Sequence, residues 1–298
     1  MSPAGVVYAL LAYGTWGLIP AYWKLLVSVP VTEILAHRAV GTVVFSVALL
    51  FVLRRLPEVR DALRSTRERR ALAAGGVLIA INWGVFVWAV GVGRIVETSL
   101  GYYLNPIVNV LLGMLLLREH LSRAQGIAVV LAACGVVVML VSHGKLPWIS
   151  LVLATSFGLY GLMHKLTNVR PIPALAVETG GLAPLAVGFL VVAVEPAGGA
   201  LGTATPLVKT LLLVAGPATA LPLLWFASAA RRLPLSTLGL FQYLAPTLSL
   251  LLAVFAYGEP FTRTHGVAFA LIWTALALYS VDALYASRSS GLRSSTTH

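Results

Sequence analysis

The chain has 298 residues, of which 59% are hydrophobic and only 10% are charged, and its mean hydropathy is +0.91. A soluble domain is usually about 25% charged, so this composition excludes an ordinary soluble enzyme or binding domain. A net charge of +11 could suggest nucleic-acid binding, but in so apolar a chain we interpret the cations as a signal that orients membrane helices.

Long apolar runs follow one another from the N-terminus. A bilayer core about 30 Å thick is crossed by roughly 20 apolar residues in a helix. Such runs span residues 4–23, 33–53, 72–92, 98–117, 122–141, 147–164, 174–194, 206–229, 235–256 and 263–284. They do not alternate polar and apolar positions as the strands of a membrane β-barrel do. The sequence therefore predicts an all-α membrane protein with ten transmembrane helices.

Two segments lie outside these runs. Residues 54–70 contain seven arginines, and either an amphipathic helix on the inner leaflet or a solvated basic loop fits this pattern. Residues 285–298 are rich in Ser and Thr, and we expect them to form a disordered cytoplasmic tail.

The chain nearly repeats itself at a shift of 140 residues. Tyr103-Leu104-x-Pro106 matches Tyr243-Leu244-x-Pro246, and Glu119 matches Glu259. Duplicated halves are a common architecture of secondary transporters, with the substrate site where the halves meet. We therefore expect one five-helix repeat over residues 1–141 and a second over residues 146–284.

The distribution of cations predicts the orientation of the helices. With a cytoplasmic N-terminus, fifteen of the 21 Lys and Arg residues fall in cytoplasmic segments. This bias follows the positive-inside rule and places both termini in the cytoplasm. Since each repeat has five spans, the second repeat enters the membrane upside down, and Glu119 and Glu259 lie on opposite sides. Such an inverted pair offers a route to alternating access.

Polar and aromatic residues within the spans are candidates to line a cavity for a flat or amphipathic organic molecule. The proposed substrate-binding residues are Tyr13, Trp16, Asn82, Trp83, Tyr102, Tyr103, Asn105, Tyr160, Trp225, Gln242 and Tyr243. For each one, simple packing is the competing interpretation. Pro106 and Pro246 are candidate hinges, because each proline removes a backbone donor at matched points of the two halves.

Four ionisable residues within the spans are candidates for coupling or charge recognition. Glu33 and His37 share a helix face, and Arg38 follows directly. A charge at the bilayer centre costs roughly 2.5–3.5 kcal/mol on insertion scales, so each needs a partner or a watery cavity. His37 and Arg38 could hold an anion, and His37, with Glu33, could carry a coupling proton. A structural Glu33–Arg38 pair is the alternative. Glu178 could take up a proton or pair with Lys165 or Arg170.

Several motifs taken together resemble one family. The motifs are Tyr13-Gly14-Thr15-Trp16-Gly17-Leu18-Ile19-Pro20, Glu33-Ile34-Leu35-Ala36-His37-Arg38, Asn82-Trp83, Ser99-Leu100-Gly101-Tyr102-Tyr103-Leu104-Asn105-Pro106, Ser156-Phe157-Gly158-Leu159-Tyr160-Gly161 and Gln242-Tyr243-Leu244-Ala245-Pro246. Along essentially its whole length the chain resembles the bacterial RarD proteins, in the EamA branch of the drug/metabolite transporter superfamily.

This resemblance implies ten helices in two inverted EamA repeats, an inner-membrane location, and export of a small metabolite or drug. It also implies a central cavity lined by the first, third and fourth helices of each half. Asn105 is replaced by Ala245 in the second half, and Arg38 has no obvious twin, so the site is expected to be asymmetric.

The sequence leaves several functions open. An importer, a flippase for lipid-like molecules and a non-transporting receptor or scaffold fit the same topology. The sequence contains neither a metal-binding motif nor a nucleophile–base set nor a P-loop, so we expect no cofactor, no enzymatic activity and no ATP hydrolysis. The expected partners are a small-molecule substrate, lipid and protons, in a monomer or homodimer.

Overall fold

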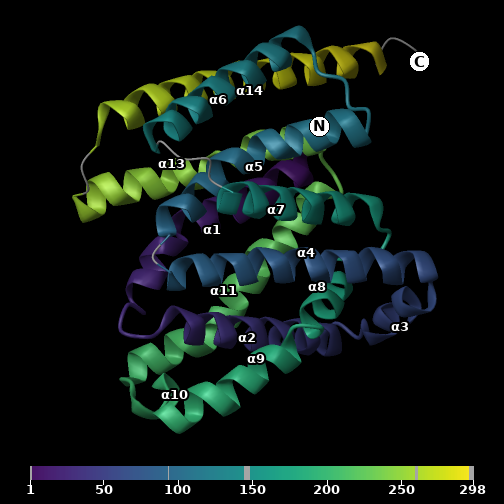
Figure 1. Ribbon diagram of the computed structural model, residues 1–298. Coiled ribbons are helices and arrows are strands. Elements are labelled where there is room, and N and C mark those ends of the chain that lie inside the picture. The colour runs from purple at the N-terminus through teal and green to yellow at the C-terminus, as the bar shows by residue number, and fades with distance from the viewer. Residues whose placement is uncertain (1, 93, 144–147, 259–260, 295–298) are drawn as a thin grey trace.

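The computed structural model describes residues 2–92, 94–143, 148–258 and 261–294, and helices account for all the regular structure in these ranges (Figure 1). Glu259, the sequence twin of Glu119, lies outside them. The helices of the first half are α1 (Pro3–Lys24), α2 (Val31–Val52), α3 (Leu56–Arg64), α4 (Thr66–Gly91), α5 (Ile95–Leu116) and α6 (Arg123–His143). Those of the second half are α7 (Trp148–Leu166), α8 (Pro171–Gly180), α9 (Ala183–Phe189), α10 (Ala200–Thr203), α11 (Pro206–Ala230), α12 (Leu235–Phe241), α13 (Leu244–Leu251) and α14 (Arg263–Ser294).

Many of these helices are long and apolar enough to cross a bilayer. Within the described residues, eight segments meet this criterion, and the bent pair α8 and α9 makes a ninth. In α5 the described apolar stretch, Gly101–Leu116, is shorter. The expected all-helical membrane protein is therefore confirmed, whereas ten spans in two inverted repeats remains a prediction.

Two segments outside the expected spans are helical. The basic segment 54–70 forms the short amphipathic helix α3 and the first residues of α4, so the expected amphipathic helix is present and the alternative of a solvated basic loop is wrong. Its position on the inner leaflet stays a prediction. Helix α14 continues to Ser294, which makes residues 285–294 helical rather than disordered as we expected. Ala and Leu are strong helix formers, and no Gly or Pro interrupts the helix between Gly266 and Gly291. Residues 295–298 lie outside the described part of the chain.

Prolines divide two of the expected continuous spans. The seventh bends by 47° between α8 and α9, where Gly180 and Gly181 precede Pro184. The ninth is interrupted between α12 and α13, because Pro246 has no N–H to donate to the carbonyl of Gln242, four residues earlier. Helix α5, by contrast, runs through Pro106 without a break. The two candidate hinges therefore differ in conformation.

The largest hydrophobic core lies at one end of the bundle. We call this the Glu119 end; there α1, α4, α8 and α12 begin and α5, α7 and α11 end. The core contains Ala9 and Tyr13 of α1, Leu175 of α8 and a long run of α11. At the opposite end, where α2 begins, which we call the Glu33 end, buried apolar residues form smaller separate clusters. The two ends of the bundle are therefore packed differently.

Helices from the two halves approach each other closely at glycines. A Cβ on Gly216 of α11 would lie 2.3 Å from the carbonyl carbon of Gly41 in α2. A Cβ on Gly239 of α12 would lie 2.7 Å from the carbonyl oxygen of Pro106 in α5. Such distances leave no room for a side chain, so backbones pack directly against each other, as small residues allow in membrane helices.

Candidate functional site

An aromatic cluster joins α1, α7 and α11 inside the main core. Tyr13 lies 5.6 Å from Trp16, and Trp16 lies 5.5 Å from Phe157 and 5.8 Å from Phe226, measured between ring centroids. Tyr160 stacks on Phe226 at 6.2 Å. Tyr13, Trp16 and Tyr160 were predicted; Phe157 and Phe226 were missed, since no spacing sets them apart from other apolar residues. The neighbouring Trp225, also predicted, is half-buried at the edge of this core.

The hydroxyl of Tyr13 is a polar group inside this apolar cluster. The side chain is fully buried, and its oxygen finds no hydrogen-bond partner in the described part of the chain. Leaving a buried hydroxyl unpaired costs about 1–3 kcal/mol, so another conformation or a bound molecule that pairs with it would be favoured.

Glu178 forms a buried polar group with two side chains of α7. Its carboxylate accepts a hydrogen bond from the Tyr160 hydroxyl at 3.0 Å and lies 3.3 Å from Nε2 of His164. His164 and Glu178 are both buried, and Glu178 also packs against Gly75 and Gly76 of α4. The partners that we expected, Lys165 and Arg170, contact other groups. His164 was missed as a site residue, although it follows Tyr160 at a helical spacing of four.

Arg38 lies among aromatic rings and hydroxyls. Its guanidinium carbon is 4.8 Å from the ring of Trp23 and 5.6 Å from that of Trp83, and its Nε donates to Thr219 Oγ1 at 3.0 Å. The hydroxyls of Tyr22 and Tyr102 are close enough to interact with it electrostatically. The structure thus brings together the predicted Arg38, Trp83 and Tyr102 and adds Tyr22, Trp23 and Thr219.

Glu33 contacts a different element from Arg38. Its Oε1 accepts from the backbone N–H of Ala200, the first residue of α10, at 2.7 Å and lies 3.6 Å from Nε2 of His37. A carboxylate at this position satisfies a backbone donor that would otherwise be unpaired. Glu33 therefore anchors the short helix α10 to α2, and the alternative Glu33–Arg38 pair does not form.

Buried amides connect α5 with α12. Asn109 donates through Nδ2 to Asn105 Oδ1 at 3.2 Å and to Gln242 Oε1 at 3.0 Å. Asn105 and Gln242 were predicted site residues, whereas Asn109, one turn beyond Asn105, was missed. The two predicted residues therefore lie in one network at the contact between the two halves.

We expect Asn109→Leu to loosen this contact at nearly constant side-chain volume. Only the bond to Gln242 joins the two halves, since Asn105 lies one turn away in the same helix. Hydrogen bonds between membrane helices are worth about 0.6–1.7 kcal/mol each, so its loss should lower the free energy of unfolding by about 0.6–1.7 kcal/mol. Unfolding in mixed micelles measures this loss. Asn168→Leu, the same substitution at an exposed residue whose side-chain amide makes no hydrogen bond among the described residues, is the matched control and should change stability by about 0.5 kcal/mol or less. Equal effects of the two variants would contradict the structural role given to the network.

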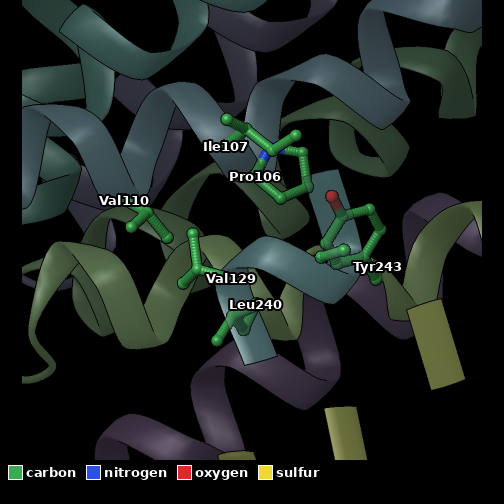
Figure 2. Close-up of a pocket in the computed structure, with 7 residues that line it drawn as sticks. Pro106, Ile107, Val110, Val129, Leu240 and Tyr243 are labelled. Atoms are coloured by element: carbon green, nitrogen blue, oxygen red, sulfur yellow. The ribbon is translucent and has the colours of Figure 1, made fainter. Parts of the chain in front are cut away.

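Other predicted residues join helices in the same region. Asn82 of α4 donates to the Leu153 carbonyl at 2.9 Å and to Ser156 Oγ at 3.0 Å, both in α7. The Tyr243 hydroxyl donates to the carbonyl of Tyr103 at 3.4 Å. Beside it, Pro106, Leu240 and Tyr243 line an apolar crevice between α5, α6 and α12, which is too narrow to hold water (Figure 2). This crevice is a packing defect beside Pro106, one of the two candidate hinges.

Some wall positions of α1, α4 and α5 are open. In the described structure no atom of another element lies within 4 Å of a Cβ placed on Gly14 or on Gly84. Tyr102 is 52% exposed although it lies beside Arg38. These positions lie next to the aromatic cluster and next to the Arg38 group, and neighbouring helices leave them uncovered.

Polar contacts fasten the Glu119 end between the halves. Glu119 accepts from the backbone N–H groups of Leu235 and Ser236 at 2.7 and 2.9 Å and from the Ser236 hydroxyl at 2.7 Å. Lys165 donates to the Leu233 carbonyl at 2.5 Å and lies 3.9 Å from Glu119. The carboxylate thereby caps α12, the first piece of the broken ninth span, and fixes it to the end of α5.

A groove at the same end is bordered by acidic side chains. It has a volume of about 420 Å³ and is lined by Glu58, Asp61, Glu68 and Arg170 among others. Arg55 holds Glu58 through two hydrogen bonds of 2.8 Å and keeps the pKa of this carboxyl below its usual value. Glu68 accepts from Thr167 and from the backbone N–H of Asn168. These carboxylates thus act mainly in joining α3 and α4 to the segment between α7 and α8.

Three bacterial proteins are similar to this chain along nearly their whole length. An uncharacterised transporter of Pseudomonas aeruginosa is 47% identical over 94% of both chains. RarD of Salmonella typhi is 46% identical over 95% of this chain and 97% of its own. YojE, an uncharacterised transporter of Bacillus subtilis, is 43% identical over 96% of both.

Two further comparisons concern the family and the fold. The profile of the EamA-like transporter family matches residues 3–141. A solved crystal structure has the same fold, with a TM-score of 0.72 at 17% identity, over 94% of this chain and 98% of the other. The chain is therefore a multi-pass membrane protein and belongs to the RarD proteins of the EamA-like transporter family.

Proposed function

We propose that this protein is a secondary transporter that moves a small organic molecule across the bacterial inner membrane by alternating access, with export as its physiological direction. Relatives along the full chain are named as transporters, which supports transport as the general activity. The substrate, the direction and the coupling ion are our own inferences from the residues and contacts below.

The arrangement of helix contacts supports two inverted repeats of five spans. We match α1, α2, α4, α5 and α6 with α7, α8–α9, α11, α12–α13 and α14. Under this match, the contact of α1 with α11 corresponds to that of α7 with α4, and both contacts are present. The contact of α2 with α11 likewise corresponds to that of α8 with α4. The contacts of α5 with α12 and of α6 with α14 each map onto themselves. Such a pattern is expected of a pseudo-twofold axis in the membrane plane.

The observation that carries the proposal is the difference between the two ends of the bundle. The Glu119 end contains the main core and is fastened by Glu119 and Lys165, whereas Gly14 and Gly84 face open space nearer the middle. The positive-inside rule assigns the Glu119 end and both termini to the cytoplasm. We infer that the structure is closed toward the cytoplasm, and that exchanging the conformations of the repeats opens that side.

Transport can be tested before the substrate has been identified. Purified protein in liposomes is incubated with a total extract of bacterial metabolites, and mass spectrometry identifies compounds that enter only protein-containing vesicles. We expect one or a few related small organic molecules. Trp16→Ala and Trp83→Ala, which enlarge the space beside the open positions, should reduce their entry severalfold. If no compound enters faster than into empty liposomes, at both orientations of a pH gradient, the transport proposal fails.

Protons are the proposed coupling ion, and we assign their binding to Glu178 and His164. The elements around Glu178 provide few competing charges: α7 contributes Tyr160 and His164, and α4 contributes backbone at Gly75 and Gly76. The adjoining stretches of α2 (42–52) and α11 (217–230) have no titratable side chain. The charged residues nearby have other partners. Arg170 pairs with Glu58, and Glu68 accepts from the backbone N–H of Asn168. Lys165 donates to the carbonyl of Leu233, and Arg231 donates to the carbonyl of Val169. A buried carboxylate next to a histidine can hold a proton in one state and release it in another.

We expect Glu178→Gln to abolish acceleration of transport by an imposed pH gradient while movement down the substrate's own gradient persists. The amide oxygen can still accept from Tyr160, but the side chain cannot exchange a proton. Vesicle uptake with and without the gradient measures the difference. Glu33→Gln is the control and should keep the pH response, because that carboxylate is bound to Ala200. A wild-type protein indifferent to the gradient would argue against proton coupling altogether.

A further inference from the structure

Arg38 has unused hydrogen-bonding capacity inside the membrane-spanning region. A guanidinium has five N–H donors arranged as a planar fork. Among the hydrogen bonds of the described residues, only Nε of Arg38 is used, in the bond to Thr219 Oγ1. The two terminal nitrogens, which form the prongs of the fork, are therefore available to another partner.

Among the described residues, no acidic side chain balances the charge of Arg38. Across the described ranges, no carboxylate lies within 4.0 Å of its guanidinium. The nearest acid along α2, Glu33, is bound to Ala200 and lies beside His37. Arg38 is the eighth residue of α2, so it lies about 10 Å along the helix from its start. A cation at this depth needs a counter-charge or water.

Aromatic rings fix the guanidinium without neutralising it. The rings of Trp23 and Trp83 lie 4.8 and 5.6 Å from its central carbon. Cation–π contacts of this kind hold an arginine by its face and leave its edge free. A carboxylate or phosphate approaching that edge can form two parallel hydrogen bonds, the strongest pairing available to arginine.

The protein covers the Arg38 group only in part. Arg38 and Trp83 are only half-buried, and Tyr102 is 52% exposed. Gly84, next to Trp83, faces open space. A flat organic group could lie along the indoles and the phenol while its anionic end reaches the guanidinium.

From this geometry we infer that Arg38 recognises an anionic group, a carboxylate or phosphate, on an organic substrate whose flat or apolar part packs against Trp23, Trp83 and Tyr102. The inference rests on the proposed transport function and names its substrate class: amphipathic organic anions. It also gives Arg38, which lacks a twin in the second repeat, a role that makes the site asymmetric.

Acids paired with neutral analogues test the inference directly. The probes are indole-3-acetate with indole-3-acetamide, and phenyl phosphate with phenol, titrated against the purified protein in phosphatidylcholine nanodiscs by isothermal titration calorimetry and thermal shift. We expect each acid to bind about tenfold or more tightly than its neutral partner, since charge-assisted bonds are about twice as strong as neutral ones. If the neutral probes bind as tightly as the acids in both pairs, or if none of the four binds, the inference is overturned.

Variants of Arg38 assign the effect to this residue. Arg38→Gln should reduce the acid-to-neutral preference to about one, and Arg38→Lys should keep part of it, because a lysine retains the charge but not the fork. Arg232→Gln is the matched control: it removes a cation that lies 5.1 Å from the ring of Tyr8 at the Glu119 end, and it should leave the preference unchanged. A preference that survives Arg38→Gln would overturn the inference. If Arg38→Gln does not fold, the probe pairs with wild type and Arg38→Lys still decide.

Two further experiments complete the test. The first distinguishes a lipid headgroup from a free organic anion, and the second distinguishes failure of the anion inference from failure of the transport proposal. In phosphatidylglycerol nanodiscs, a loss of acid binding that depends on Arg38 would assign the same anion site to a lipid headgroup. In the liposome assay, the compounds that enter should be organic anions, and Arg38→Gln should slow them tenfold or more. If only neutral or cationic compounds enter, transport stands and the anion inference falls; if nothing enters while acids still bind through Arg38, transport falls.

Discussion

Gly216→Ala is expected to destabilise the protein by about 3 kcal/mol or more, because overpacking of this kind forces the backbone to move. The added Cβ would lie 2.3 Å from the carbonyl carbon and 2.5 Å from both the Cα and the carbonyl oxygen of Gly41. These atoms are backbone, so a side-chain rotation cannot relieve the clash, and α2 must separate from α11. Thermal unfolding in detergent micelles measures the loss.

Two other glycines provide a graded control for this prediction. At Gly41, a Cβ would lie 2.9 Å from the Gly216 Cα, so Gly41→Ala should destabilise less than Gly216→Ala. At Gly126 of α6, in the described structure nothing lies within 4 Å, and Gly126→Ala should be neutral or stabilising by up to about 1 kcal/mol through helix propensity. The same loss at Gly126 as at Gly216 would show that the close contact of α2 with α11 is not what matters.

Glu119→Ala is expected to open the Glu119 end of the bundle. The carboxylate accepts three hydrogen bonds at the start of α12, and bonds to a charged group are worth about 1.5–3 kcal/mol each. Even a partly compensated loss of about 3 kcal/mol would raise the population of the state open at the Glu119 end by about a hundredfold. The labelling rate of Leu112→Cys, a half-buried position in the main core, by an impermeant maleimide in a Cys134→Ala background measures this opening.

Matched changes at the same end make the result specific. Ser236→Ala removes only one of the three donors and should increase labelling less than Glu119→Ala does. Glu58→Gln removes a carboxylate of α3 that is paired with Arg55 and should leave the labelling unchanged. Unaltered labelling in Glu119→Ala, with the fold intact, would mean that the contact does not hold the closed state.

Several features of the site depended on contacts that no sequence pattern describes. The aromatic residues of α1 and α7 were predicted, and in the structure they contact one another, whereas Asn105 and Gln242 bond to Asn109. Phe226, Asn109 and His164 complete these groups. Each of these three residues lies on a helix surface, and the helix that packs against that surface depends on how segments distant in the sequence cross. The spacing of the three residues in the sequence therefore gave only a weak signal of their role in the site.

The sequence by itself determined the membrane character and the approximate limits of the helices, because lipid requires long apolar runs whose backbone hydrogen bonds are satisfied within each helix. It also contained the repeat and the distribution of cations. Only the tertiary structure decided the partners of the few polar groups: Glu178 with Tyr160 and His164, Glu33 with Ala200, and Glu119 with α12. In a medium without water, a buried polar group must bond to whatever donor or acceptor the packing brings near. For Glu33 and Glu119 the packing joins segments more than a hundred residues apart, whereas Glu178 bonds to the preceding helix.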